Sequence, residues 1–391
     1  MTSNTRAGDK GIELLTSGMA SGGDAIAHDA AGKAVFVRGA LPGERVRVRL
    51  VTDRARYAIG SIDELMESSP DRVMPPCPEV DRGCGACQWQ YVSIAMQQRL
   101  KLQFIVESLE RSGVRCPDPS PSVELAPWAF RTTIKAAITD GRAGYLRTRS
   151  HQVIPVDTCL VAHPLLVDLL VEALYPGARQ VLLRCGARTG ERLAATTPSG
   201  LDLRLPRDVR SDHLHEFVAG RRWRISARSF FQTRADGAEA LAELVGSAAD
   251  ELGAPTTSVD LYSGVGLFAG VLAARGWSVT AVEGSRSAAA DAAFNLSDSD
   301  ASVVHADITR WKPTRGDLVV ADPSRIGLGR TGVEAIKATG ARRVVLISCD
   351  GPSLGRDAAL LMRAGYGLSA VTYVDLFPQT FRIEAVTVYD R

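Results

Sequence analysis

Four acidic or nucleophilic side chains end or follow short apolar runs in the C-terminal half of the chain. The runs cover 278–283, 302–305, 318–321 and 343–347, and the side chains at or just after their ends are Glu283, Asp307, Asp322 and Cys349. Short runs rich in Val, Ile and Leu are typical of parallel strands that are buried on both faces. Because ligands bind at the carboxyl ends of the strands in open α/β sheets, we expect these four side chains to converge on one site.

A glycine-rich turn follows the run that ends at Tyr262 and leads into a helix. Gly264, Gly266 and Gly270 let the backbone turn tightly and approach a ligand. Glu283, 19 residues after Gly264, can accept both hydroxyls of a ribose. The spacing Gly-x-Gly-x-x-x-Gly is not the dinucleotide pattern and no P-loop lysine is present, which favours S-adenosylmethionine. A tight turn without a ligand is the alternative interpretation.

Cys349, Asp307 and Glu384 each have a structural as well as a functional interpretation. Cys349 precedes a helix expected over 354–363, whose N-terminus can favour a nucleophilic thiolate, but a lone cysteine after a strand can also be a small buried apolar residue. Asp307 is either placed to meet an adenine or is a solvated carboxylate. Glu384, on the last strand, either pairs with Arg382 or points into the cleft. The residues alone leave these alternatives open.

A second group of residues with potential chemistry is a cysteine cluster. Cys77, Cys84 and Cys87 lie within 11 residues, and the glycines between them allow tight wrapping. Cys159 is the best candidate for a fourth ligand, whereas Cys116 and Cys185 fit core positions better. The Cys-x-x-Cys pair alone allows zinc or a redox pair. Because a second such pair is absent, three clustered cysteines plus a remote one favour an iron–sulfur cluster over zinc.

Strand and helix patterns divide the chain into four regions. Residues 1–10 are expected to be flexible, and 11–70 contain short strands with turn signals that predict a small β-barrel of the oligonucleotide-binding type. Residues 71–220 predict a mixed α+β central domain that carries the cysteine cluster, with a helix over 91–112. Residues 221–391 alternate strands with alanine-rich helices over 285–296 and 354–363, which predicts a doubly wound, Rossmann-like α/β domain.

An ordered set of motifs resembles one known family. The set runs from Gly22-Gly23-Asp24 and Pro42-Gly43-Glu44 through the cysteine cluster with Gln88-Trp89-Gln90 and then Ser229-Phe230-Phe231-Gln232. It continues with the Asp260 glycine motif, Asp322-Pro323, Ser348-Cys349 and Asp375 to Thr380 before Glu384. In this order the motifs resemble the TRAM-domain, S-adenosylmethionine-dependent RNA uridine-C5 methyltransferases of bacteria, which act on 23S ribosomal RNA or transfer RNA. The resemblance spans nearly the whole chain and implies a class I methyltransferase fold.

The resemblance implies a role for each candidate residue. Cys349 would be the nucleophile, Glu384 the base, and Asp322 would position the uracil. The cofactor site would be lined by Gln232, Tyr262, Gly264, Gly266, Glu283, Asp307 and Asp322. A four-iron four-sulfur (4Fe-4S) cluster would be held by Cys77, Cys84, Cys87 and Cys159.

The expected reaction is methyl transfer to carbon 5 of a uridine in ribosomal or transfer RNA through a covalent cysteine–uracil adduct. The target base would be flipped out of an RNA loop, with Phe230 or Phe231 stacking on it and the other packing in the core. Two alternatives remain open: a non-catalytic RNA-binding or chaperone protein that keeps the fold, and a cytosine-C5 RNA methyltransferase.

Several residues depart from the family pattern near the expected site. Leu267 stands where asparagine is common, and Cys349 is followed by Asp350-Gly351-Pro352 instead of Asn-Pro. An inward-pointing Asp350 would raise the pKa of the thiol. Ser324, Gln379, Arg382 and a Cys77–Cys84 gap longer by one residue are further departures, although none removes a proposed catalytic residue.

Composition excludes a polybasic tail protein and a disordered acidic chain, since Lys+Arg is 46 and Asp+Glu is 44 in 391 residues. A local arginine face remains possible, because Arg45, Arg47 and Arg49 alternate along one strand with Arg54 and Arg56 beyond it. No run is long and apolar enough for a membrane span. We expect a cytoplasmic protein, a monomer with no obligate protein partner.

Overall fold

The computed structural model describes residues 11–121 and 123–391, which form two compact units. The first unit comprises the chain to Pro76 together with Cys87–Lys101 and Gln379–Phe381. The second comprises Cys77–Ala86, Leu102–Pro378 and Arg382–Arg391. The expected flexibility of residues 1–10 concerns positions outside the described residues.

The first unit is built around a closed five-stranded barrel with the strand order β1-β2-β3-β5-β4. The strands are β1 (Ile12–Met19), β2 (Ala25–His28), β3 (Ala34–Arg38), β4 (Arg45–Asp53) and β5 (Tyr57–Glu67). Val46 and Val48 of β4 are fully buried while the arginines that alternate with them, Arg45, Arg47 and Arg49, face outward, as period-2 alternation requires. The predicted barrel is therefore confirmed.

The second unit contains a mixed sheet of six strands in the order β12-β11-β10-β7-β8-β9. Its elements are β7 (Thr133–Thr139), β8 (Arg142–Leu146), β9 (Val153–Pro155), α2 (Pro164–Val171), β10 (Gln180–Cys185), β11 (Arg192–Thr197) and β12 (Val209–Arg210). A separate hairpin follows, made of β13 (His213–Val218) and β14 (Arg221–Ser226). The expected domain boundary at residue 220 falls in the turn of this hairpin, and the domain limits themselves stay predictions.

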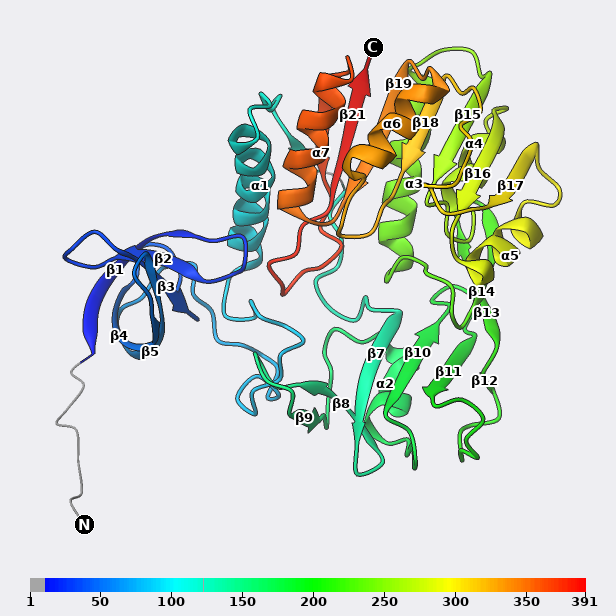
Figure 1. The fold of residues 1–391 in the computed structure, drawn as a ribbon. Coiled ribbons are helices and arrows are strands. Elements are labelled where there is room, and N and C mark those ends of the chain that lie inside the picture. The colour runs from blue at the N-terminus through cyan, green and yellow to red at the C-terminus, as the bar shows by residue number, and fades with distance from the viewer. Residues whose placement is uncertain (1–10, 122) are drawn as a thin grey trace. The chain divides into compact units, whose positions relative to one another are not determined.

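The second unit also contains an eight-stranded sheet in the order β17-β16-β15-β18-β19-β21-β20-β6 (Figure 1). Its strands are β15 (Thr257–Leu261), β16 (Ser278–Glu283), β17 (Ala301–His305), β18 (Leu318–Ala321), β19 (Arg343–Ser348), β20 (Gly367–Tyr373), β21 (Ala385–Asp390) and the short edge strand β6 (Ser120–Pro121). β15 to β19 pair in parallel, and β21 lies antiparallel between β19 and β20. The strand order reverses between β15 and β18, where such sheets bind ligands.

Helices connect the strands of this sheet. They are α3 (Ala235–Asp250), α4 (Leu267–Ala273), α5 (Arg286–Asn295), α6 (Gly329–Thr339) and α7 (Gly351–Arg363), preceded in the chain by α1 (Ile94–Arg111). α4 and α5 pack on β16 and β17, and α6 packs on α7 (Figure 1). The core buries Trp223 and Trp277 among alanine and branched aliphatic side chains. The Rossmann-like α/β class predicted from the sequence is confirmed.

The structure differs from the expectations in detail at the last strand. Glu384 was expected on that strand, but β21 begins one residue later, at Ala385. The edge strand β6 comes from the central region of the sequence and was not expected. No helix among the described residues has the length and hydropathy that a membrane crossing requires.

Candidate active site

The glycine turn after β15 requires glycine at each of its three positions for a different reason. Gly264 has φ 56° and its N–H donates to Glu283 Oε2 over 2.8 Å. Gly266 has φ 94°, and a Cβ there would lie 2.9 Å from the Leu296 side chain. A Cβ at Gly270 would lie 2.4 Å from the ring of Trp223. The third glycine therefore serves helix packing, and the first two shape the turn.

Glu283 ends β16 beside this turn, and both of its oxygens already accept backbone hydrogen bonds. Besides Gly264, the N–H of Ser285 donates to Glu283 Oε1 over 2.5 Å. These bonds fix the carboxylate at the carboxyl end of its strand and leave lone pairs for further donors. Glu283 is half-buried, so a ligand can reach it.

Asp307 is exposed after β17, and one of its oxygens caps a local turn. Its Oδ1 accepts from the N–H of Thr309 over 2.9 Å and from the Thr309 hydroxyl over 2.6 Å. These bonds hold the pKa of Asp307 below its usual value. The geometry matches the solvated-carboxylate interpretation and leaves the other oxygen available.

Tyr262 has a left-handed backbone, with φ 61°, which is uncommon for a residue other than glycine. Such conformations cluster at functional sites because the surroundings must enforce them. Burial raises the pKa of Tyr262 to about 12, and the charges of Asp307 and Asp357 add to the rise. The hydroxyl therefore stays protonated at neutral pH and can donate a hydrogen bond.

Two buried polar atoms at the turn have no hydrogen-bond partner within the described chain. They are Oδ1 of Asp260 and Oγ of Ser263. Asp260 is fully buried, and its other oxygen accepts from the N–H of Ala269 over 2.9 Å. Burial raises the pKa of Asp260 well above its usual value. Because buried polar groups are normally paired, these two atoms mark a place where a bound molecule could supply partners.

Strand register brings Cys349 and Glu384 together. In the antiparallel pair of β19 and β21, Ser348 pairs with Ala385. Cys349 follows the first of these residues and Glu384 precedes the second, so the two side chains stand opposite each other where the ladder ends. Asp322 directly follows β18, whose Ala321 pairs with Leu346 of β19. Three of the sequence-predicted site residues thus meet at one edge of the sheet.

Burial raises the pKa values of the acids and the thiol at this edge, and neighbouring acids raise those of Glu384 and Cys349 further. Burial raises the pKa of Asp322 to about 7, opposed by a hydrogen bond from Gln232 Nε2 to its Oδ2 over 3.0 Å. Burial and then the Asp322 carboxyl raise the pKa of Glu384 well above its usual value. Burial raises the pKa of Cys349 to about 12, and Glu384 and Asp322 add to the rise while Arg325 opposes it. Perturbed groups of this kind cluster at functional sites.

The helix after Cys349 does not produce a low thiol pKa in this structure. Asp350 is the N-cap of α7, and its Oδ2 accepts from the N–H of Ser353 over 3.0 Å. The carboxylate therefore points to the helix end, where it compensates the positive end of the helix dipole. Its charge contributes to the raised thiol pKa only after burial, Glu384 and Asp322.

The segment that carries Gln232 is fixed by two residues that the sequence analysis missed. Asp291 on α5 accepts from the N–H and hydroxyl of Ser226, each over 2.8 Å, and from the hydroxyl of Ser229 over 2.6 Å. Buried Arg184 donates to the carbonyls of the same two serines. The one sequence signal for Asp291 was an acidic residue within an otherwise alanine-rich helix.

Within this segment the two phenylalanines have different surroundings. Phe231 is buried in the core, whereas Phe230 is 62% exposed. Core packing was expected for one of the two, and Phe231 takes that position.

Asp357 on α7, which with Arg356 is part of the family's motif set but had no role assigned from the sequence, holds the loop that follows Asp322. It is buried and accepts from the N–H groups of Leu328 over 2.7 Å and Gly329 over 3.1 Å. A Cβ at Gly327 would lie 2.1 Å from its Oδ2, so this close approach requires glycine. Asp357 therefore positions the loop between β18 and α6 at the edge of the candidate site.

Known proteins resemble this chain along its whole length. Residues 11–62 match the TRAM domain family. A protein of Streptomyces avermitilis described as an uncharacterized RNA methyltransferase is 32% identical over 97% of this chain and 98% of its own length. A Gloeobacter violaceus protein with the same description is 31% identical over 97% of this chain and 96% of its own. The chain belongs to this family of RNA methyltransferases.

The fold of this RNA methyltransferase matches a solved structure over nearly its full length. The Pyrococcus abyssi tRNA (uracil-54, C5)-methyltransferase, solved with S-adenosyl-L-homocysteine, covers 97% of this chain with all of its own. The TM-score is 0.74 and the sequence identity is 21%. The likeness establishes a shared architecture, including the class I methyltransferase sheet.

Three of the four predicted cluster cysteines of this RNA methyltransferase lie in the second unit, and Cys87 lies in the first. The chain wraps tightly between Cys77 and Cys84: the N–H of Cys84 donates to the Glu79 carbonyl over 2.9 Å. Burial raises the pKa of Cys84 to about 11, and Cys159 and Cys77 are close enough to add to it.

The two glycines beside Cys84 permit this wrapping. Gly83 has φ 90°, and a Cβ at Gly85 would lie 2.7 Å from the carbonyl oxygen of Leu146. Within residues 11–121 and 123–391, no three His, Cys, Asp or Glu side chains are arranged to hold a single metal ion. Cys185 is buried on β10, as expected for a core cysteine, whereas Cys116, for which the same was expected, is only half-buried.

The arginine face expected on the barrel is neutralised by carboxylates in the structure. Arg45 pairs with Glu67 over 2.9 Å, Arg49 with Asp63 over 3.2 Å, and Arg47 with both Glu13 and Glu64. Arg54 and Arg56 are exposed and have no ion-pair partner within the described residues. The first three arginines therefore stabilise strand pairing, which was not foreseen because their partners come from β1 and β5.

Proposed function

We propose that this RNA methyltransferase uses S-adenosylmethionine to methylate carbon 5 of a uridine in ribosomal or transfer RNA. The observation that carries the proposal is the register that sets Cys349 opposite Glu384, with Asp322 at the end of the neighbouring strand. A thiol and a base brought together at the ends of neighbouring strands are what addition to a pyrimidine ring followed by proton removal requires. The architecture shared with a tRNA uracil-C5 methyltransferase supports the same reaction.

The residues around the glycine turn fit S-adenosylmethionine. Glu283 would accept the ribose hydroxyls, and the unpartnered atoms of Asp260 and Ser263 offer contacts for the amino-acid end. Near Gly264, a Cβ would meet only the Phe230 carbonyl at 3.8 Å, which leaves space for a ligand. Gln232, Tyr262 and Asp307 complete the proposed lining. When bound, S-adenosylmethionine supplies an electrophilic methyl group on a sulfonium.

In the proposed reaction, the Cys349 thiolate adds to carbon 6 of uracil and forms a carbon–sulfur bond. The electron pair of the 5,6 double bond moves toward the C4 carbonyl, so carbon 5 becomes nucleophilic and takes the methyl group. Glu384 then removes the proton from carbon 5. Re-formation of the double bond breaks the bond to sulfur and releases the thiolate.

Proton transfer follows from the raised pKa values of the site. In the ligand-free protein, Cys349 with a pKa of about 12 keeps its proton at neutral pH, and Glu384 also binds its proton more tightly than usual. A cationic sulfonium nearby favours the charged forms of both groups and lowers their pKa values. Loss of the thiol proton to solvent is therefore more favourable in the loaded site than in the empty one.

Uracil recognition is assigned to Asp322 and the exposed Phe230. Asp322, with a pKa of about 7 and oriented by Gln232, can accept from or donate to a polar edge atom of the base. Phe230 is available for stacking on the base because its ring is exposed. Asp291 and Arg184 fix the segment that carries both Phe230 and Gln232.

We also propose that Cys77, Cys84, Cys87 and Cys159 hold a 4Fe-4S cluster. In such a cluster each thiolate binds a different iron, so the ligands surround it instead of meeting at one point. The proposal is supported by the tight loop that carries Cys77 and Cys84 and by the electrostatic effect of Cys77 and Cys159 on the Cys84 thiol. Anaerobically purified protein should be brown and contain iron. Stoichiometric zinc without iron would refute the cluster.

The proposed function is tested by the modified nucleosides in RNA. RNA from a strain lacking the gene is incubated with the purified protein and labelled S-adenosylmethionine, then digested and analysed by mass spectrometry. We expect 5-methyluridine. A product of 5-methylcytidine would establish the cytosine alternative, and bound S-adenosylmethionine without product would establish a non-catalytic RNA-binding protein.

A further inference from the structure

A cavity of about 550 Å³ lies in the second unit beside the segment that leads to the active site. Its walls come from β11, the loop 199–207, the strand β12 and residues 227–228. This volume is in the range of pockets that bind small ligands or single nucleotides. None of the residues assigned to the reaction lines it.

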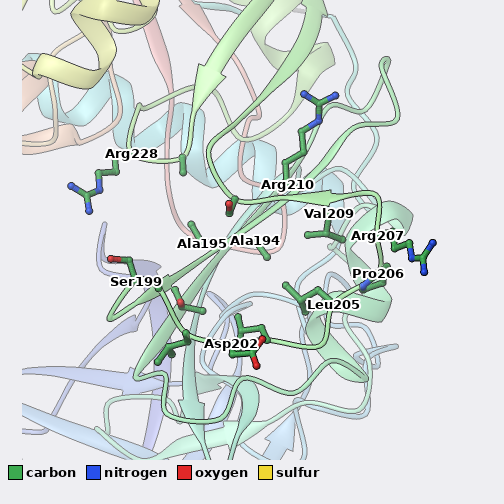
Figure 2. A pocket seen from close by; sticks show the side chains of 16 residues that line it. Ala194, Ala195, Ser199, Asp202, Leu205, Pro206, Arg207, Val209, Arg210 and Arg228 are labelled. Atoms are coloured by element: carbon green, nitrogen blue, oxygen red, sulfur yellow. The ribbon is translucent and has the colours of Figure 1, made fainter.

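The lining combines an apolar floor with a positive rim. Figure 2 shows Ala194 and Ala195 in the middle, with Arg207, Arg210 and Arg228 around them and their guanidinium groups directed outward. The floor and walls also include Leu201, Leu203, Leu205 and Val209, and the hydroxyls of Thr196, Ser199 and Ser211. Asp202 is the acidic residue of the lining. An apolar surface with hydroxyls below a cationic rim is suited to a base and ribose with their phosphate.

The arginines of this rim are more available than Arg45, Arg47 and Arg49 of the barrel, which are paired with carboxylates. Arg207 and Arg228 are exposed and have no ion-pair partner within residues 11–121 and 123–391. Arg210 lies 3.8 Å from a Glu191 oxygen, and Glu191 is already engaged by Arg222 and His215. A phosphate can therefore bind here without displacing a close carboxylate.

One short segment connects the cavity to the reaction site. Ala227 and Arg228 line the cavity, and Gln232 contacts Asp322. Four residues of extended chain span at most about 14 Å, so Arg228 at the cavity rim and Gln232, whose amide orients Asp322, are close in space. The clamp formed by Asp291 and Arg184 on Ser226 and Ser229 holds this segment in place between them.

We propose that this cavity binds a nucleotide of the RNA substrate that neighbours the target uridine in the RNA chain. The inference rests on the proposed function, since the neighbouring nucleotide is defined by a uridine at Cys349. A flipped base leaves its neighbours to be held by the protein. The unpaired rim arginines would bind the phosphate and the floor would contact the base or ribose.

The test combines steady-state kinetics with RNA binding by the full-length protein. The double variant Arg207→Ala/Arg228→Ala removes two proposed phosphate contacts. RNA from a strain lacking the gene is the methylation substrate, and a fluorescein-labelled oligouridylate is the binding probe. We expect KM for RNA and Kd for the probe to rise roughly tenfold, with kcat within about twofold. The slope of log affinity against log salt should become shallower by about 1.4.

Two further variants separate charge from fold. Arg204→Ala lies in the same loop and is exposed but does not line the cavity, so we expect wild-type values. Ala195→Leu partly fills the floor without changing charge, and we expect it to raise KM for RNA as well. Thermal midpoints equal to the wild type would show that each variant is folded.

The outcomes decide between the possible occupants. Ultraviolet cross-links from the oligouridylate to peptides covering 199–211 or 226–233 would support the proposal. Equal KM and Kd in the double variant and the wild type would overturn it, and so would competition by uridine monophosphate as effective as by the oligouridylate. Tight, cross-linked RNA binding without any methyl transfer would refute the proposed function while supporting an RNA-binding role for the cavity.

Discussion

Two regions of this molecule gather charged side chains, and they do so in opposite ways. On β4 and β5 of the barrel, exposed arginines pair with exposed carboxylates. At the strand ends of the large sheet, burial raises the pKa of Asp322, Glu384 and Cys349, and the nearby acids raise that of Glu384 and Cys349 further. In the first arrangement the charges are paired within the protein. In the second, the protonation states of the acids depend on what binds beside them.

The difference shows which cluster is built for chemistry. An exposed ion pair contributes about 0–1 kcal/mol to the free energy of unfolding, and both of its charges already have a partner. Buried acids with pKa values raised in this way persist only where the fold enforces them, which is typical of catalytic sites. The alternating arginines of β4 are the more conspicuous pattern in the sequence, yet the buried acids carry the proposed reaction.

The largest expected effect is that of Cys349→Ala. Because the proposed reaction begins with addition of this thiol, we expect methyl transfer to fall by at least roughly 10³-fold, while S-adenosylmethionine binding stays within about twofold. Labelled methyl transfer and equilibrium dialysis measure the two quantities. The matched control is Cys116→Ala, a cysteine away from the site, which should keep full activity. Retained turnover in Cys349→Ala would show that the strand-end cluster is not the reaction site.

Glu384→Gln should reduce turnover by roughly 10²–10⁴-fold, because the amide cannot remove the proton from carbon 5. The covalent adduct should accumulate, since the base acts only after the thiol has added to the ring. The variant also removes a carboxyl that raises the pKa of Cys349, so the thiol should be alkylated faster at a given pH. Iodoacetamide labelling between pH 7 and 10 measures this. Slower labelling of the variant would contradict the assigned electrostatics.

Asp322→Asn should stabilise the protein against unfolding in a pH-dependent way. The pKa of Asp322 is about 7 in the folded protein, against 3.8 for an aspartate without a perturbing environment, as in the unfolded chain. Between these two pH values the folded state therefore binds more protons than the unfolded state. Wild-type stability therefore falls as pH rises through this window, and the asparagine variant should escape that loss. Thermal midpoints at pH 5 and pH 8 should show a larger gain at pH 8.

The control variant, Asp298→Asn, should change the thermal midpoint in the opposite direction. Arg221 lowers the pKa of the exposed Asp298 by hydrogen bonding, so its carboxylate is favoured in the folded state. Asp298→Asn should therefore lower the midpoint slightly at pH 8. A gain in both variants would contradict the contrast between the buried and the paired acids.

The smallest effect is expected on the barrel. Arg47→Ala/Arg49→Ala should change RNA affinity by less than about twofold, because a phosphate would compete there with carboxylates of the protein. Arg54→Ala/Arg56→Ala, which removes two unpaired cations, should weaken binding several-fold and reduce its salt dependence. Filter binding of RNA at two salt concentrations distinguishes the two double variants. Equal losses in both double variants would erase the distinction between paired and unpaired arginines.

Much of the fold was predictable because its signals are local. The alternation in β4, the apolar runs of β15 to β19 and the glycine turn each specify a structure within a few residues. The position of Glu384 was less predictable, because it depends on the register in which β21 pairs with β19, a strand that is distant in sequence.

The features that could not be predicted depend on partners from distant elements. The carboxylates that neutralise Arg45, Arg47 and Arg49 come from other strands. The clamps made by Asp291 and Asp357 similarly join a helix to loops that lie far away in the chain. A sequence pattern gives the face of a residue but not the neighbour that it meets there.

The central claim is that Cys349 forms a covalent bond to carbon 6 of a target uracil. Incubation of the protein with S-adenosylmethionine and RNA containing 5-fluorouridine tests it, because fluorine at carbon 5 cannot be removed as a proton by Glu384. We predict a protein–RNA adduct that survives denaturation and maps by mass spectrometry to the peptide containing Cys349. Production of 5-methyluridine from normal RNA without any such adduct would contradict the account.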